Sequence, residues 1–383
     1  MNILISTDSH KDFASSQQVG EWIKCGLREV SSDFNINVLP IGDGGEGTIE
    51  AILTAQGGQV ISCKVHDPLF RPRLAKIGMF NDAERTAVIE IAEASGSAVL
   101  APHERDTMLA TSFGTGEMIH CVLDRNCRHI IVGLGGSIVS DGGMGMAQAL
   151  GARFYDTEGI ELSPENNKGF NVLSLHRVAK IDMGNQLRRV HSVNVSIAAD
   201  VRTKLLGPQG QAAIFGPQKG ATPEQIEFID EGLRNWSIVL HRTFGKNFDV
   251  EFAGAAGGLG AGLAAFLGGR LELGIDLVLR EIDFEEKLNA SDLVITGEGR
   301  LDKTSLHGKA SCVIATKAQE MGKAVVGLFG VVLLDSERSR EFFDKIIRAF
   351  PSGIQSDSIS IEKCKIGIIQ AGKRAGEWIR ARN

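Results

Sequence analysis

Three short loops in this 383-residue sequence combine glycine with acidic or hydroxyl side chains. They span residues 42–47 (GDGGEG), 133–137 (GLGGS) and 297–302 (GEGRLD). Glycine lets the backbone approach a ligand closely and adopt positive φ. Carboxylates in such loops would repel a phosphate unless a divalent cation lay between them. The loops therefore predict a site for a metal ion and a phosphate-bearing ligand.

The first loop has two acids, Asp43 and Glu46, that are candidates for holding a cation or a substrate hydroxyl. The loop also has the glycine spacing of a dinucleotide-binding fingerprint. Asp43 and Glu46 would face the diphosphate of that ligand with negative charge, so the sequence disfavours this interpretation. A glycine-rich turn with solvated acids is the remaining alternative.

The second loop continues into a second glycine pair, Gly142-Gly143, at the start of a predicted helix. Free N–H groups and the positive end of the helix dipole favour phosphate binding at such a turn. Gly135, Gly136 and Ser137 are the candidate contacts. Ser140 or Asp141 could alternatively be an ordinary helix N-cap.

Further charged residues follow predicted strands or precede predicted helices. Asp8, Asp43 and Glu298 follow strands of one predicted sheet and should gather at its carboxyl edge, where ligands bind in open α/β sheets. Asp200 ends another predicted strand. It is a candidate general base or metal ligand, and the alternative is a solvated acid at a strand end. The lysines that could contact an anion are Lys11, Lys219 and Lys309, the last in a near miss to a Walker A loop that lacks its first glycine and its Ser or Thr.

The elements that must position these residues form two groups. Strands are predicted at 2–6, 36–41, 292–296, 324–329 and 345–349, with helices at 15–30, 46–55, 309–321, 336–343 and 361–381. This alternation predicts one doubly wound parallel sheet of five or six strands, interrupted by an insertion.

The middle of the chain has a different pattern. Closely spaced strands at 59–65, 73–80 and 86–91 predict a mixed or antiparallel sheet. They precede helices at 115–125, 142–150 and 224–244, strands at 129–134 and 193–198, and a tightly packed helix at 257–267. The fold class is therefore α/β, with a second α/β domain inserted into the first.

Composition excludes several classes of protein. The net charge of −6 argues against nucleic-acid binding. No apolar run approaches a membrane span or a signal peptide. The six cysteines are scattered, as expected of reduced thiols in a cytoplasmic protein. The histidines lack HExxH spacing and no Gly-x-Ser-x-Gly elbow occurs, so neither a zinc site nor a serine hydrolase is predicted.

The chain resembles the bacterial glycerate kinases of the glycerate 2-kinase type over nearly its whole length. The matching stretches, in order, are 8–11, 43–48, 112–117, 135–143, 206–208, 215–221, 254–260 and 296–302. The resemblance implies phosphorylation of D-glycerate by ATP with Mg²⁺, usually at the 2-hydroxyl. It also implies a flavodoxin-like domain over 1–62 and 290–383, an inserted domain over 63–289, and an active site in the cleft between them.

On this resemblance we assign hypothetical roles to the residues singled out above. The expected catalytic residues are Asp200 as general base, with Asp43, Lys11 and Glu298. The expected substrate and phosphate contacts are Asp8, Ser9, Arg300, Asp302, Lys309 and Lys219. The expected ATP contacts are Gly135, Gly136, Ser137 and Asp141. Asp43, Glu46 and Glu298 are the expected magnesium ligands. We expect a monomer or homodimer without nucleic-acid or membrane partners.

The sequence departs from the family pattern mainly in its glycine loops and strand ends. Thr7 and His10 replace a proline and a phenylalanine, and segments 138–140, 202–204 and 303–305 also differ. These positions are where a change of substrate should be sought. The alternatives are a paralogue acting on another small hydroxy acid or on the 3-hydroxyl, and a non-catalytic ligand-binding homologue. A flavodoxin-like electron carrier is a third, weaker alternative.

Overall fold

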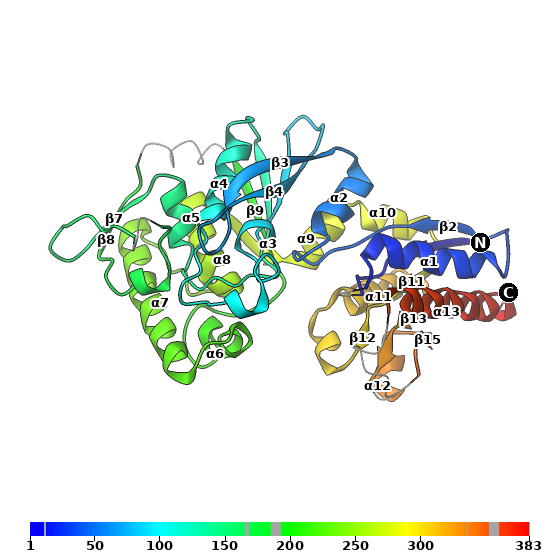
Figure 1. Cartoon of the computed structure of the whole chain (residues 1–383). Coiled ribbons are helices and arrows are strands. Elements are labelled where there is room, and N and C mark those ends of the chain that lie inside the picture. Colours follow the sequence, from blue (N-terminus) through cyan, green and yellow to red (C-terminus); the bar gives the residue numbers. More distant parts are fainter. Residues whose placement is uncertain (11–12, 165–167, 185–192, 335, 352–359, 383) are drawn as a thin grey trace. The chain divides into compact units, whose positions relative to one another are not determined.

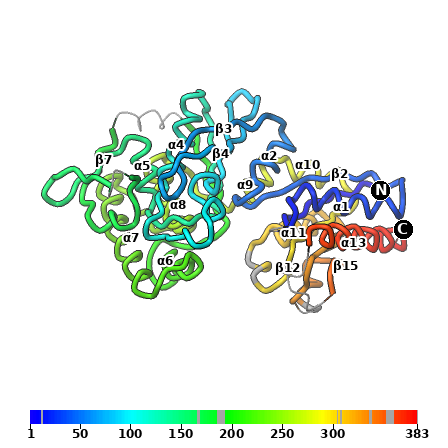
Figure 2. Tube along the Cα trace, in the orientation of Figure 1, coloured from blue at the N-terminus to red at the C-terminus, as the bar shows by residue number. Residues whose placement is uncertain are grey.

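The computed structural model describes residues 1–10, 13–164, 168–184, 193–334, 336–351 and 360–382. The chain divides into two compact units. Unit 1 comprises Met1–Asp43, Glu50–Gln56 and Val278–Asn383, and unit 2 comprises Gly44–Ile49 and Gly57–Leu277. Figures 1 and 2 trace how the two ends of the chain meet in unit 1 while its middle forms unit 2.

Unit 1 contains a five-stranded parallel sheet in the order β15-β13-β11-β1-β2. The strands are β1 (Asn2–Ile5), β2 (Asn35–Val38), β11 (Leu293–Thr296), β13 (Ala324–Phe329) and β15 (Lys345–Arg348). The central strand β1 pairs with β2 and β11, placing Ile5 opposite Val38 and Ile295. The predicted doubly wound sheet, built from both ends of the chain, is confirmed.

Helices cover both faces of this sheet. Ile5 and Ile295 pack with helices α1 (Ser16–Arg28) and α13 (Ile361–Arg382), whereas the alternate residues Leu4 and Val294 are equally buried. Burial on both faces explains why these strands are continuously apolar. Helices α1 and α13 lie side by side (Figure 1). A Cβ on Gly26 would clash with the Ile369 carbonyl of α13, so this close approach requires glycine.

The remaining helices of unit 1 are short. They are α10 (Phe284–Asn289), α11 (Ala310–Glu320) and α12 (Ser336–Arg340), together with most of α2 (Thr48–Gln56) and the end of α9 (Gly274–Glu281). Two short strands, β12 (Arg300–Leu301) and β14 (Val331–Val332), pair in parallel beyond the main sheet.

Unit 2 contains a six-stranded mixed sheet in the order β10-β9-β6-β5-β4-β3. The strands are β3 (Gln59–His66), β4 (Pro72–Met79), β5 (Ala87–Glu90), β6 (His129–Gly133), β9 (Asn194–Ala199) and β10 (Arg270–Leu273). The β3–β4 and β4–β5 pairs are antiparallel, and the others are parallel. The predicted mixed sheet is confirmed, with β10 as an additional strand.

The helices of unit 2 bury one continuous apolar core that includes the fully buried Trp236. They are α3 (Ala92–Ser95), α4 (Phe113–Leu123), α5 (Met144–Ala149), α6 (Gln211–Phe215), α7 (Pro223–Phe244) and α8 (Leu259–Leu267). A small hairpin, β7 (Arg153–Tyr155) with β8 (Lys180–Asp182), adds to this unit.

Helices α5 and α8 begin later than the sequence predicts, for a reason visible in the backbone. Helix α5 begins at Met144 rather than 142, because Gly142 and Gly143 have φ of 60° and 81°. Helix α8 begins at Leu259, because the three residues before it also have positive φ. These left-handed turns are incompatible with a regular helix and create irregular loops at the sheet edge. No helix in the described ranges is both long and apolar enough to cross a membrane.

Candidate active site

The parallel strands β6 and β9 of unit 2 end side by side, with Gly133 opposite Ala198. Their carboxyl ends therefore bring the loop 134–138 and residues 200–201 to one edge of the sheet. A cavity of about 520 Å³ opens at this edge. Its lining residues are Ser97, Pro102, Arg105, Leu134, Gly136, Ser137, Ile138, Asp200, Val201, Phe215, Gln218, Lys219, Gly220, Ala256 and Gly257.

The second glycine loop forms one wall of this cavity. Gly136 has a φ of 77°, a conformation that glycine adopts without strain, and its carbonyl accepts a hydrogen bond from Ser97 N at 2.9 Å. Ser137 forms an isolated bridge with Gly96. Backbone contacts therefore fix the loop at Gly136 and at Ser137, and both residues line the cavity.

The first glycine loop packs directly against the second. Gly44 O accepts a hydrogen bond from Gly135 N at 3.0 Å. A Cβ on Gly135 would clash with Gly45, and a Cβ on Gly133 would clash with Gly44. Glycine at 133 and 135 is therefore needed for the two loops to meet, in addition to any contact with a ligand.

Lys219 and Asp200 place opposite charges in the cavity. The Lys219 ammonium donates a hydrogen bond to the Val139 carbonyl at 2.5 Å. Burial lowers the pKa of Lys219 to about 8, although the nearby carboxylates of Asp141 and Asp200 oppose that shift. Lys219 therefore remains mostly protonated at neutral pH, and the cavity holds a cation and a carboxylate together.

Asp141, an expected ATP contact, is not among the residues that line the cavity. Its side chain is fully buried, and its Oδ2 accepts hydrogen bonds from Ser112 N and Ser112 Oγ, both at 2.8 Å. The N–H groups of Gly143 and Gly145 also donate to this carboxylate. Asp141 therefore fixes the backbone of the loop through these hydrogen bonds.

In unit 1, three predicted acids follow neighbouring parallel strands, as expected. Asp8 follows β1 and Glu298 follows β11, and the Asp8 N–H donates to the Gly297 carbonyl at 2.8 Å. Asp43 follows β2, the other neighbour of β1. The carboxyl edge of this sheet is therefore acidic.

The buried Glu298 organises the third loop. Its Oε2 accepts a hydrogen bond from Lys309 Nζ at 2.8 Å, and its Oε1 accepts one from Ser311 Oγ at 2.7 Å. Both oxygens thus already have donors, which favours Glu298 as the residue that positions Lys309. Lys309 is partly exposed, so its ammonium can also contact an anion.

The other predicted residues are more scattered. In unit 1, Ser9 N donates to Asp8 Oδ1 at 2.7 Å, Arg300 is exposed, and Asp302 lies in a turn with Ser305. Glu46 is exposed and belongs to unit 2. Lys11 lies outside the described residues.

The donor set at these strand ends consists of carboxylate and hydroxyl oxygens, the chemistry that Mg²⁺ requires. Within the part of the chain that the structure describes, no group of three or more His, Cys, Asp or Glu side chains lies close enough together to hold a metal by itself. Mg²⁺ in phosphoryl-transfer sites is usually bound by one or two carboxylates, with phosphate oxygens and water completing its shell. The residues fit an ion of that kind and do not form a cage for a permanently bound metal.

Comparison with known proteins identifies the family. The glycerate kinase family model matches residues 3–378. A glycerate kinase of Bacillus subtilis is 40% identical over 337 residues, which are 88% of this chain and 86% of that protein. A glycerate 2-kinase of Escherichia coli is 40% identical over 86% of this chain and 85% of that protein. The crystal structure of a putative glycerate kinase 2 from Salmonella typhimurium aligns over 100% of this chain and 98% of that one, with a TM-score of 0.85 and 36% identity.

The chain belongs to the glycerate kinase family. The resemblance predicted from the glycine loops is confirmed, as are the α/β fold class and the assignment as a kinase.

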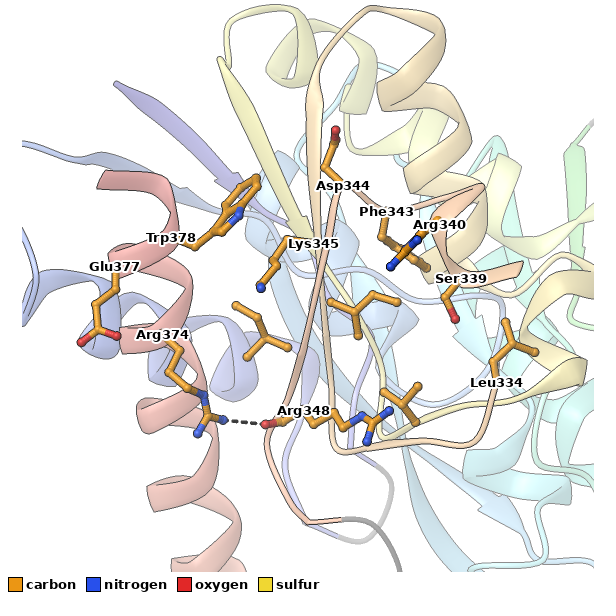
Figure 3. Close-up of a pocket in the computed structure, with 13 residues that line it drawn as sticks. Leu334, Ser339, Arg340, Phe343, Asp344, Lys345, Arg348, Arg374, Glu377 and Trp378 are labelled. Carbon is orange, nitrogen blue, oxygen red and sulfur yellow. Dashed lines mark hydrogen bonds between the residues drawn. The ribbon is translucent and has the colours of Figure 1, made fainter. Parts of the chain in front are cut away.

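A larger cavity of about 790 Å³ in this glycerate kinase family member lies in unit 1, between β15 and α13 (Figure 3). Its basic residues include Lys345 and Arg374, and the Arg374 guanidinium donates to the Arg348 carbonyl at 2.5 Å. The sequence-predicted site residues that the structure describes do not line it. We therefore place the candidate active site at the unit 2 cavity, where a glycine loop, an acid and a lysine meet.

Sequence reasoning missed two charged residues of this glycerate kinase family member. Arg105 lines the unit 2 cavity and donates through Nε to the Ser97 carbonyl at 3.1 Å, but in the sequence it lies in a charged run typical of surface loops. Glu90 is a buried acid at the end of β5 that accepts a hydrogen bond from Ile49 N at 2.8 Å. The sequence does contain a signal for Glu90, because an acid in an otherwise apolar strand is unusual.

Proposed function

We propose that this protein phosphorylates D-glycerate at the 2-hydroxyl, with ATP as phosphoryl donor and 2-phosphoglycerate as product. The observation that carries the proposal is the unit 2 cavity, in which the glycine loop, Asp200 and Lys219 come together. The names of the relatives from Bacillus subtilis and Escherichia coli support the same substrate.

In this proposal, Gly136 and Ser137 supply backbone N–H and hydroxyl donors to phosphate oxygens. Lys219 and Arg105 supply positive charge for the transferring phosphoryl group or the substrate carboxylate. Phosphoryl transfer depends mainly on alignment and charge neutralisation. Fixed donors on the glycine loop and cations from neighbouring segments provide both alignment and charge neutralisation without reorganising during the reaction.

Asp200 is the proposed general base. Asp200 and Lys219 both line the cavity, and the negative charge of Asp200 raises the pKa of Lys219. A carboxylate there can accept the proton of the attacking hydroxyl as the bond to phosphorus forms.

The acidic sheet edge of unit 1 supplies the second proposed set of contacts. Asp43, Glu46 and Glu298 remain candidate carboxylate ligands of Mg²⁺, which would neutralise charge on the phosphate oxygens. Glu298 holds Lys309 in place for an anionic group, and Lys11, Asp8, Ser9, Arg300 and Asp302 remain candidate substrate contacts. Their roles rest on the strand-end positions and on the family resemblance.

The experiment that tests the function incubates the protein with ATP, Mg²⁺ and D-glycerate and identifies the product by phosphorus NMR. We expect 2-phosphoglycerate. An exclusive 3-phosphoglycerate product would refute the 2-hydroxyl assignment, and nucleotide binding without product would favour the non-catalytic homologue.

The role of Asp200 is tested by Asp200→Asn. Loss of a general base typically lowers turnover by about 10²–10⁴-fold. ATP affinity should change little, because the amide keeps the size of the side chain. The matched control is Glu251→Gln, which neutralises an exposed acid paired with Arg202 and should leave turnover unchanged. Unchanged turnover in Asp200→Asn would refute the assignment.

One observation favours a second candidate function, phosphorylation of another small hydroxy acid. Ile138 lies in a segment that departs from the family pattern, and it lines the cavity. A panel of small 2-hydroxy acids and glycerate, assayed by ADP release, separates the two. A kcat/KM for another acid above that for D-glycerate would favour the second candidate.

A further inference from the structure

Two cysteines of unit 2 lie on neighbouring elements, away from the cavity. Cys63 is on strand β3 and Cys121 is near the end of helix α4, and both side chains are partly buried and partly accessible. Both pack against the edge of the same apolar core. Neither is a lining residue of the candidate active site.

The register between β3 and α4 brings the two side chains together. At one end of the contact, His66 N donates to Glu117 Oε2 at 2.7 Å, and Gly114 packs against the His66 carbonyl. Three residues of strand span about 10 Å. Seven residues of helix, from Gly114 to Cys121, also span about 10 Å. Cys63 therefore faces Cys121 across the packed β3–α4 pair, and the two thiols interact with each other.

The charged surroundings favour a thiolate at Cys121. Arg125 Nη1 donates to Cys121 Sγ at 3.0 Å and to the Cys121 carbonyl at 2.8 Å. The hydrogen bond from the Cys63 thiol, assisted by Arg125, lowers the pKa of Cys121 to about 7, although burial and Asp124 oppose the shift. The same hydrogen bond raises the pKa of Cys63, with burial and Glu117 adding to the effect. The pair thus shares one proton, which is the arrangement of an attacking thiolate beside a resolving thiol.

We propose that Cys63 and Cys121 form a reversible intramolecular disulfide when the protein meets hydrogen peroxide. The Cys121 thiolate attacks one peroxide oxygen, the O–O bond breaks, and hydroxide leaves and is protonated to water. The Cys63 sulfur then loses its proton and attacks the Cys121 sulfenic sulfur, and the S–O bond breaks to release a second water. The two thiols lose two electrons and two protons, and the peroxide is reduced to two molecules of water.

Two other cysteines serve as internal comparisons. Cys25 is exposed on α1 of unit 1, so peroxide reaches it, but the structure provides no cysteine beside it in the described residues. Cys127 follows α4 and is only 2% exposed, with its sulfur against Met79 Sδ at 4.0 Å. Cys25 should form no intramolecular disulfide, and Cys127 should react slowly.

The test treats the full-length protein with hydrogen peroxide at pH 7, blocks remaining thiols, and maps tryptic peptides by mass spectrometry without reduction. The expected result is a Cys63–Cys121 linked peptide that disappears after dithiothreitol, with a loss of two titratable thiols. The link should persist in Cys25→Ser and be absent in Cys121→Ser. A link between Cys121 and Cys127, or only sulfinic acid at Cys121, would overturn the proposal.

A second measurement tests the pairing without an oxidant. At pH 7 about half of Cys121 is thiolate, so iodoacetamide should alkylate it about threefold faster than an ordinary thiol, after allowing for its lower intrinsic nucleophilicity. Cys63→Ala removes the hydrogen-bond donor and should abolish most of this advantage. An unchanged alkylation rate in Cys63→Ala would show that the thiols do not interact. Kinase activity and circular dichroism of each variant report whether the fold is retained.

Discussion

Glu90 gives a quantitative prediction about the pH dependence of stability. It is 7% exposed at the end of β5. Burial raises its pKa from 4.5 to about 7, and the nearby carboxylates of Glu93 and Glu46 add to that effect, whereas hydrogen bonds from the N–H groups of Ile49 and Gly47 oppose it. Near neutral pH the folded protein therefore holds a proton on Glu90 that the unfolded chain has lost.

The sign and size of the effect follow from linkage. Below pH 4.5 Glu90 is protonated in both states and carries no penalty. As pH rises, the unfolded state ionises first, so stability falls until the folded carboxyl also ionises above pH 7. The penalty is about 0.8 kcal/mol at pH 5 and about 3.3 kcal/mol at pH 8. Glu90→Gln removes the ionisation and keeps an acceptor for Ile49. The unfolding free energy of the variant minus that of the parent should therefore be about 2.5 kcal/mol larger at pH 8 than at pH 5.

The assay is urea unfolding monitored by the fluorescence of Trp236, which is fully buried in unit 2. The other two tryptophans, Trp22 and Trp378, belong to unit 1 and are replaced by phenylalanine in both proteins. The transition then reports unit 2 alone, which avoids treating the whole chain as two-state.

Glu84→Gln is the matched control, because Glu84 is an exposed acid just before the same strand. It should show little change with pH relative to the parent. If the stability difference between Glu90→Gln and the parent were the same at pH 5 and pH 8, Glu90 would be ionised in the folded protein. That result would refute the assignment of a protonated buried carboxyl.

Three further predictions concern the cavity and its support. Gly135→Ala introduces a Cβ that clashes with Gly45, and overpacking of this kind should destabilise unit 2 by about 1–3 kcal/mol in the same urea assay. Lys219→Met should lower kcat/KM, and the parent's kcat/KM should fall above pH 8 as the ammonium loses its proton, whereas the variant should lack that limb in a pH–rate profile. Asp141→Asn removes a carboxylate that accepts hydrogen bonds from Ser112 N and Oγ and should lower the thermal midpoint of unit 2; because that carboxylate also raises the pKa of Lys219, the alkaline limb of the pH–rate profile should move to lower pH.

Much of the fold was predictable because both sheets consist of short apolar strands punctuated by glycine or charge. Of the two main sheets, the strand not predicted is β10, which is only four residues long and has Arg270 and Glu272 alternating with leucines. Charged residues at alternate positions of so short a segment resemble a surface loop. Its strand conformation depends on pairing with β9, a contact that the local sequence does not encode.

The candidate site was predictable where chemistry coincides with a strand end. Asp200 and Ser137 follow β9 and β6, so the parallel topology brings them together. Asp141 shows the limit of that reasoning, since a carboxylate in a glycine loop can face a ligand or the protein's own N–H groups. Only the packing of Ser112 against it decides between them.

The division of the chain between the two units has a consequence for synthesis on the ribosome. The backbone passes from one unit to the other after Asp43, Ile49, Gln56 and Leu277. The central strand β1 is made among the first residues, but its neighbour β11 is not made until residue 293. Unit 2 is complete once Leu277 has emerged, so it can fold while the first strands of unit 1 still wait for their partners. We therefore expect the nascent N-terminal segment to be the stretch most in need of protection from aggregation during translation.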